Sequence, residues 1–212
     1  SIRLHQLLTG SDDAVDEYAE ILSAGVGLVV DAATTIDTVN RQVQLENGAP
    51  LAYDYLIYAV GSGAATPAVT GAAEFAYPVA DLAQAQRLAV ALGEVPHSDR
   101  ICVVGAGPTG METAAELAEQ GRAVTLVCGR VLGPYLSKPG RASAARRLRK
   151  LGVEVIAGPG ATAETVTADS VTLADGRRLP SAVTIWTVGF GVPDLARRSG
   201  LRTDPAGRLL TD

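Results

Sequence analysis

Residues 101–119 read ICVVGAGPTGMETAAELAE and combine an apolar run, a glycine-rich turn and a helix-like pattern, in that order. The run 101–104 is typical of a strand that is buried in a parallel sheet. After the G-x-G-x-x-G turn, alanine and leucine recur at helical spacing. A second apolar run follows at 124–127, so one strand–helix–strand unit fits within about thirty residues. The pattern predicts an α/β fold with a parallel sheet.

The glycines of this turn each have a separate physical role in such a unit. Gly105 permits the tight turn out of the strand, Gly107 lets the backbone approach a pyrophosphate, and Gly110 lets the helix pack closely on the strand. Pro108 stands where a missing N–H costs little, and Thr109 completes the turn. Together with the positive end of the helix dipole, the turn predicts a dinucleotide site. The alternative is a glycine-rich turn that binds nothing.

Composition excludes several other classes of protein. Of the 212 residues, 47% are hydrophobic and 19% are charged, which excludes intrinsic disorder. The net charge of -5 argues against nucleic-acid binding through bulk charge. Cys102 and Cys128 are too few for a disulfide framework, and His5 and His97 are isolated, so no metal site is predicted. No apolar run reaches the roughly 20 residues of a bilayer-spanning helix, and we expect a cytoplasmic protein.

The second half of the chain repeats part of the first half. At an offset of 128, residues 43–63 and 171–191 share 8 identities in 21 positions. Residues 24–30 resemble residues 151–157 at nearly the same offset. Each copy is predicted to form a strand, a small antiparallel meander, a buried strand and a glycine. The repeat therefore indicates two fused dinucleotide-binding modules.

The G-x-G-x-x-G turn belongs to the second copy alone. Gly105 precedes Gly189 by 84 residues, and the same spacing from Gly61 falls before residue 1. We therefore expect the second copy to be complete and the first copy to be partial.

Other segments have simpler patterns. Residues 81–94 are predicted to form an amphipathic helix with Asp81 as its N-cap, and residues 12–22 a surface helix. Residues 67–78 are expected to connect the modules. Residues 139–151 are predicted to form an arginine-rich helix, whose basic run fits a solvated face and a helix C-terminus. The alternative for that run is a nucleic-acid or lipid site.

Three motifs together resemble those of the pyridine nucleotide-disulfide oxidoreductase superfamily, whose members are flavoproteins with two dinucleotide-binding domains. Residues 105–119 resemble the NAD(P)H fingerprint of that superfamily. Residues 53–62 (YDYLIYAVGS) resemble the segment that leaves the FAD domain, and residues 184–190 (TIWTVGF) the matching return segment. The sequence GAGPTGME and residues 3–7 (RLHQL) are most similar to the type II NADH dehydrogenase and apoptosis-inducing-factor-like branch. The resemblance implies a Rossmann-like FAD/NAD(P)-binding fold with a parallel sheet and a small antiparallel meander.

The resemblance also implies a division of the chain into four parts. These are a partial FAD-binding domain at 1–66, a connection with a helix at 67–97, an NAD(P)H-binding domain at 98–187 and a return segment toward the FAD domain at 188–212.

The implied activity is that of an FAD-dependent NAD(P)H oxidoreductase, in which this chain presents NAD(P)H for hydride transfer to the flavin. The FAD fingerprint and the Gly-Asp motif of the family are not in the sequence, so we expect the chain by itself to bind FAD poorly and to be inactive. The alternative is a non-catalytic dinucleotide-binding or sensing module. Nucleic acid is not an expected partner, and attachment to the inner face of a membrane would use parts outside this sequence. The electron acceptor and the oligomeric state stay open.

The predicted coenzyme site extends beyond the turn to the end of the second strand. Cys128 stands 18 residues after Gly110, where a carboxylate would receive the ribose hydroxyls of NAD. Arg130 either pairs with a 2′-phosphate, which would favour NADPH, or lies in solvent.

Glu112, Gly189 and Gly61 complete the candidate site, for which no catalytic residue is predicted. The resemblance places Glu112 and Gly189 near the nicotinamide and Gly61 near the FAD. Without a ligand, Glu112 is an acid favoured by the helix dipole, and Gly189 ends a strand.

Overall fold

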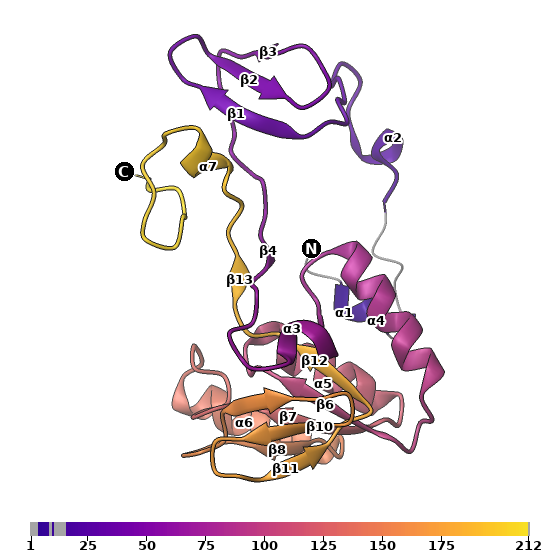
Figure 1. Cartoon of the computed structure of the whole chain (residues 1–212). Helices are drawn as coiled ribbons and strands as arrows, with labels where there is room; N and C mark the ends of the chain where they lie inside the picture. The colour runs from indigo at the N-terminus through magenta and orange to yellow at the C-terminus, as the bar shows by residue number, and fades with distance from the viewer. Residues whose placement is uncertain (1–3, 9, 11–15, 212) are drawn as a thin grey trace. The chain divides into compact units, whose positions relative to one another are not determined.

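The computed structural model describes residues 4–8, 10 and 16–211, and the chain divides into two compact units (Figure 1). The first unit comprises Ser1–Val15 and Ala64–Phe190, and the second comprises Asp16–Gly63 and Gly191–Asp212. The chain passes between the units at β4 (Gly63–Ala64) and β13 (Phe190–Gly191), and these two short strands pair with each other.

A five-stranded sheet forms the centre of the first unit. Each pair of neighbouring strands is parallel, so the predicted α/β fold with a parallel sheet is confirmed. The strand order is β5 (Ala76–Pro78), β12 (Val183–Trp186), β6 (Arg100–Val104), β7 (Ala123–Val127) and β8 (Glu154–Ile156).

Helices cover one face of this sheet. Leu88 and Leu117, from two of these helices, are fully buried in one cluster with Ile101 and Leu126 of the central strands. None of the helices that the structure describes is long and apolar enough to cross a lipid bilayer. The helices of this layer are α1 (Leu4–Leu7), α4 (Leu82–Glu94), α5 (Pro108–Glu119) and α6 (Lys138–Lys150).

A small antiparallel sheet packs on the opposite face, in front of the parallel sheet in Figure 1. Successive side chains of β6 point to opposite faces, so Ile101 and Val103 join the helix-side cluster, whereas Cys102 and Val104 join the meander-side cluster. The second apolar cluster also contains residues of the short helix α3 (Ala72–Phe75). The antiparallel sheet consists of β11 (Arg178–Pro180), β10 (Ser170–Leu173) and β9 (Ala163–Val166), in that order.

Two of the predicted helices form as expected. Asp81 caps α4, since its carboxylate accepts a hydrogen bond from the Gln84 N–H at 2.8 Å. α6 begins one residue before its predicted start, and the Ser137 hydroxyl caps it.

Two other segments differ from their predictions. Residues 12–15 of the predicted surface helix 12–22 lie outside the described residues, and only α2 (Tyr18–Ile21) is helical in the rest. The predicted connection 67–78 contributes the edge strand β5 to the parallel sheet, where it pairs with β12.

The second unit contains the meander that the repeat predicts. β1 (Ala33–Asp37), β2 (Gln42–Leu45) and β3 (Leu51–Ala52) form an antiparallel sheet in that order. The Ser199 hydroxyl, just after α7 (Leu195–Arg198), accepts a hydrogen bond from the Ile36 N–H at 2.8 Å and so joins that helix to β1.

The prediction that two further strands flank the meander in this first copy is wrong. Residues 24–30 and 55–58 are not strands, and Val30 and Ile57 are 87% and 88% exposed. A strand that is buried on both faces needs paired neighbours and covering helices. The described residues of this unit supply neither to these segments.

Arg122 joins the loop before β7 to the end of α4, and this contact gives a stability prediction. Its guanidinium donates hydrogen bonds to the carbonyl oxygens of Val95 at 2.9 Å, Pro96 at 3.2 Å and Leu92. Because a lysine ammonium cannot span three carbonyls in a fixed fork, we expect Arg122→Lys to lower the free energy of unfolding by about 1–3 kcal/mol. Urea denaturation measures this change.

Arg87→Lys, on the exposed face of α4, is the matched control for this substitution and should change stability by less than about 0.5 kcal/mol. Equal effects of the two substitutions would show that the three carbonyl contacts of Arg122 contribute nothing specific.

Candidate functional site

The glycine turn (residues 105–110) leads from β6 into α5 and is fixed at two points by its backbone. The Gly105 N–H donates to the carbonyl oxygen of Val127 at 2.9 Å, which ties the turn to the end of β7. The Ala106 carbonyl accepts from the Gly133 N–H at 3.1 Å. Gly107 is the N-cap of α5 and has no side chain, so the first N–H groups of the helix are left to another acceptor.

The three glycines of the turn have different surroundings. Gly105 has a φ of +117°, a conformation that side chains rarely adopt. A Cβ on Gly110 would lie 2.0 Å from the Gly105 carbonyl oxygen, because the helix approaches the turn closely there. A Cβ on Gly107 would meet nothing within 4 Å. The space beside Gly107 is therefore open, whereas the space beside Gly110 is filled by the protein itself.

A pocket of about 390 Å³, called here the main pocket, opens along the glycine turn. Its volume lies in the range of small-molecule sites, and it is formed at the carboxyl ends of β6, β7 and β12, where open parallel sheets bind ligands. Most of its wall is apolar or backbone. The lining residues are Val69, Val104, Gly105, Ala106, Gly107, Pro108, Thr109, Val127, Cys128, Gly129, Pro134, Tyr135, Thr162, Ala163, Trp186, Thr187, Val188, Gly189 and Phe190.

The wall of the main pocket after β7 is uncharged. Cys128 is half-buried, its thiol donates to the Leu126 carbonyl at 3.6 Å, and burial raises its pKa to about 12. The thiol is therefore neutral at physiological pH. Among the described residues, no aspartate or glutamate lines the pocket, and no group of three or more potential metal ligands occurs. Arg130 follows Gly129 in this loop and is exposed.

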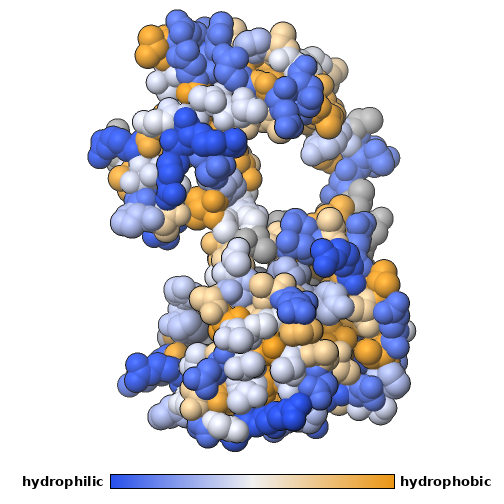
Figure 2. Space-filling model, viewed as in Figure 1, coloured by the Kyte–Doolittle hydropathy of each residue, from blue (hydrophilic) through white to orange (hydrophobic). Residues whose placement is uncertain are grey.

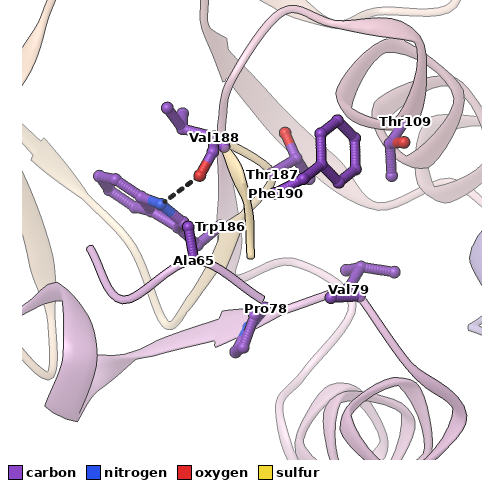
Figure 3. Close-up of a pocket in the computed structure, with 10 residues that line it drawn as sticks. Ala65, Pro78, Val79, Thr109, Trp186, Thr187, Val188 and Phe190 are labelled. Carbon is purple, nitrogen blue, oxygen red and sulfur yellow. Dashed lines mark hydrogen bonds between the residues drawn. The ribbon is translucent and has the colours of Figure 1, made fainter. Parts of the chain in front are cut away.

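A smaller hollow of about 10 Å³ lies beside the glycine turn and is shown in Figure 3. The Trp186 indole N–H donates to the Val188 carbonyl at 3.1 Å, which fixes the indole at the end of β12. Thr109 from the start of α5 and Phe190 from β13 line the same hollow. Its volume is close to the space of one water molecule, so this hollow is too small for a coenzyme.

The structure brings six of the ten predicted site residues together around the main pocket. These are Gly105, Gly107, Pro108, Thr109, Cys128 and Gly189.

The other four predicted residues do not line the main pocket. Gly110 is buried beneath the turn, and Glu112 is exposed on α5. Arg130 is exposed two residues beyond Cys128. Gly61 belongs to the second unit and has a φ of +70°.

Several lining residues were not predicted from the sequence. Trp186, Thr187 and Phe190 lie near Gly189 in the return segment, of which only Gly189 was predicted to be a site residue. Tyr135 and Thr162 come from loops without a recognisable motif. The aromatic residues in TIWTVGF were the one signal that could have identified part of this wall.

Comparison with known proteins matches residues 2–212 to the family model described as pyridine nucleotide-disulphide oxidoreductase. An NADH dehydrogenase-like protein of Mycobacterium tuberculosis is 32% identical over 207 residues, which cover 89% of this chain and 51% of that protein. The ferredoxin–NAD(+) reductase component of the biphenyl dioxygenase system of Paraburkholderia xenovorans is 34% identical, covering 78% of this chain and 41% of that protein.

Solved structures show the same fold. The ferredoxin reductase of the CYP199A2 system from Rhodopseudomonas palustris superimposes with a TM-score of 0.78 at 20% identity, covering 95% of this chain and 52% of that one. NDH2 from Plasmodium falciparum in complex with NADH gives a TM-score of 0.73 at 20% identity, covering 93% and 49%. The chain spans about half the length, or less, of these curated relatives.

Proposed function

The chain belongs to the pyridine nucleotide-disulphide oxidoreductase family, and from this we propose that its main pocket binds NAD(P)H as the coenzyme module of a flavoprotein oxidoreductase. Members of the family use NAD(P)H and FAD. The observation that carries the proposal is the open side of Gly107 at the N-terminus of α5, which borders the main pocket. A pyrophosphate there would accept from the free N–H groups of the turn and gain from the helix dipole.

The chain's own residues would bind and orient the coenzyme. The glycine turn would hold the pyrophosphate, and the apolar wall would exclude water from the nicotinamide end. The Cys128 loop would receive the adenosine ribose, since it follows the strand next to the turn. NAD(P)H itself supplies the hydride chemistry.

We propose that NADPH is preferred to NADH at this site. The Cys128 thiol is neutral and none of the described residues that line the pocket has a carboxylate, so none of them replaces the acid that ordinarily binds the ribose hydroxyls of NAD. Arg130 is exposed on the same loop and offers a planar cation for a 2′-phosphate.

The second unit, as far as the structure describes it, has no helix N-terminus that fits the pyrophosphate of FAD. The sequence contains one G-x-G-x-x-G, at 105–110. The helices α2 and α7 of the second unit have four residues each, and their N-caps, Glu17 and Asp194, carry carboxylates that would repel a pyrophosphate. We therefore assign none of the described residues to the flavin.

The names of two relatives indicate the chemical class of the electron acceptor of the whole protein. Relatives are named as a ferredoxin–NAD(+) reductase and as a type II NADH:quinone oxidoreductase. A ferredoxin-type protein or a quinone is accordingly the acceptor class that we propose.

Titration of the 212-residue chain with NADH and NADPH tests the proposal directly. Trp186 is the single tryptophan and lines the main pocket, so bound reduced nicotinamide should quench its fluorescence through energy transfer. We expect saturable quenching by both coenzymes and tighter binding of NADPH. Absence of saturable quenching, together with no heat of binding in calorimetry, would refute the site. Tighter binding of NADH would overturn only the preference.

A further inference from the structure

We infer that Thr187 is a positioning residue for the glycine turn, whose hydroxyl holds the turn in the shape that binds pyrophosphate. The inference rests on the proposed coenzyme site. Thr187 follows the last residue of β12, and its backbone N–H donates to the Val104 carbonyl at 2.9 Å. This bond extends the β12–β6 pairing by one residue, to the point where the turn begins.

The Thr187 hydroxyl continues this contact into the turn itself. Its Oγ1 lies 3.0 Å from the Val104 carbonyl oxygen and 3.3 Å from the Gly105 carbonyl oxygen. A hydroxyl has one proton, so the two carbonyls share a single donor. The Gly105 carbonyl thus has a partner even though the positive φ of Gly105 turns the chain out of the regular sheet.

The same hydroxyl occupies space that two glycines leave free. A Cβ on Gly105 would lie 2.4 Å from Thr187 Oγ1, and a Cβ on Gly110 would lie 2.6 Å from it. Thr187 therefore packs against both the start of the turn and the first turn of α5. It therefore fixes the spacing between the start of the turn and the start of α5, whose N–H groups would bind the pyrophosphate.

The position of Thr187 suits this role better than a purely structural one. The residue is half-buried and lines the main pocket, and β12 is held independently by its pairing with β5 and β6. Loss of the hydroxyl should loosen the turn while the strand stays in place. Because a binding site that must order itself on binding has a lower affinity, the nucleotide would bind more weakly.

Two substitutions at this position separate the hydroxyl from the shape of the side chain. Thr187→Val keeps the branched shape and removes the donor, and we expect about tenfold weaker binding of both NADH and NADPH. The two losses should be equal, because both coenzymes contain the pyrophosphate. Thr187→Ser restores the donor and should bind within about threefold of the unmodified chain.

Thr184→Val is the matched control on the same strand. Thr184 is buried, and its hydroxyl bonds to that of Ser181 at 2.8 Å, away from the main pocket. Its loss should leave coenzyme affinity unchanged within about twofold. Thermal unfolding of each variant shows whether it is folded; should Thr187→Val fail to fold, Thr187→Ala takes its place in the comparison.

Amide hydrogen exchange at Gly105 and Met111, whose N–H groups donate to the Val127 and Gly107 carbonyls, provides a readout in the nucleotide-free chain that does not depend on binding. We expect faster exchange there in Thr187→Val than in Thr187→Ser or Thr184→Val. Unchanged exchange and unchanged affinity in Thr187→Val, or equal losses in the valine and serine variants, would overturn the inference. If the unmodified chain binds neither coenzyme, the proposed function fails, and the exchange rates still decide whether Thr187 orders the turn.

Discussion

Gly110→Ala will both lower the stability of the first unit and strongly weaken coenzyme binding. The new Cβ would lie 2.0 Å from the Gly105 carbonyl oxygen and 2.6 Å from Thr187 Oγ1, and the first of these contacts is with backbone that cannot rotate away. Overpacking of this kind costs about 3 kcal/mol in the free energy of unfolding. The helix must move away from the turn, so we expect coenzyme affinity to fall by more than about a hundredfold. Urea denaturation and the quenching of Trp186 measure the two effects.

Gly107→Ala, three residues earlier, is expected to separate these two effects. Its Cβ would meet no protein atom within 4 Å, and the φ of Gly107 is -73°, which alanine adopts freely. Stability should therefore fall by no more than about 1 kcal/mol, which is the cost of replacing glycine by alanine at a helix N-cap. The methyl group would project into the open space proposed for the pyrophosphate, so affinity should still fall about a hundredfold.

Gly93→Ala in α4 is the control for both substitutions. It also meets nothing within 4 Å and lies outside the main pocket, so it should stabilise the helix slightly and leave binding unchanged. Coenzyme binding by Gly107→Ala at the affinity of the unmodified chain would show that the glycine turn is not the phosphate site.

The central part of the fold could be predicted because its signals are local. The run 101–104, the glycine turn and the helix after it occupy one continuous segment, and each step follows from backbone sterics or apolar spacing. The meander of the second unit could be predicted from its repeat in the first, since each copy has a glycine in the turn between its last two strands, Gly48 and Gly176.

The flanking strands of the second unit could not be predicted, because an apolar run does not specify its neighbours. Residues 55–58 and 183–186 correspond at the offset of 128, but only the second segment lies between two parallel strands. The short strand β5 could not be predicted because its own sequence gives too little signal. It has three residues and ends in Pro78, which suits an edge strand and gives no periodic signal.

Part of the site could not be predicted because its residues lie far from the glycine turn along the chain. Cys128 could be found by counting from the turn, because both belong to one strand–helix–strand unit. Thr187 and Trp186 are about eighty residues from Gly105, and they reach it because β12 inserts between β5 and β6. Strand order is determined by the packing of the whole sheet, and no spacing rule predicts it from the sequence.

A carboxylate at position 128 should reverse the proposed coenzyme preference. Cys128 is neutral in the native chain because burial raises its pKa to about 12, so it neither repels a 2′-phosphate nor accepts strongly from ribose hydroxyls. In Cys128→Glu the carboxylate would accept from the hydroxyls of NADH and strengthen binding about tenfold. It would repel the phosphate of NADPH and weaken binding about tenfold. The ratio of the two dissociation constants should therefore change about a hundredfold.

Two further variants separate charge from the loss of the thiol in this experiment. Cys128→Ala removes the thiol without adding charge and should leave the ratio of the two dissociation constants unchanged. Arg130→Ala should weaken NADPH alone, because only that coenzyme has a 2′-phosphate for the guanidinium to pair with. Equal changes for NADH and NADPH in Cys128→Glu would mean that the ribose lies elsewhere, and an unaffected NADPH affinity in Arg130→Ala would remove Arg130 from the site. The ratio depends on the ribose alone, whereas Gly107 and Thr187 affect both coenzymes equally, so the two ends of the main pocket are tested independently.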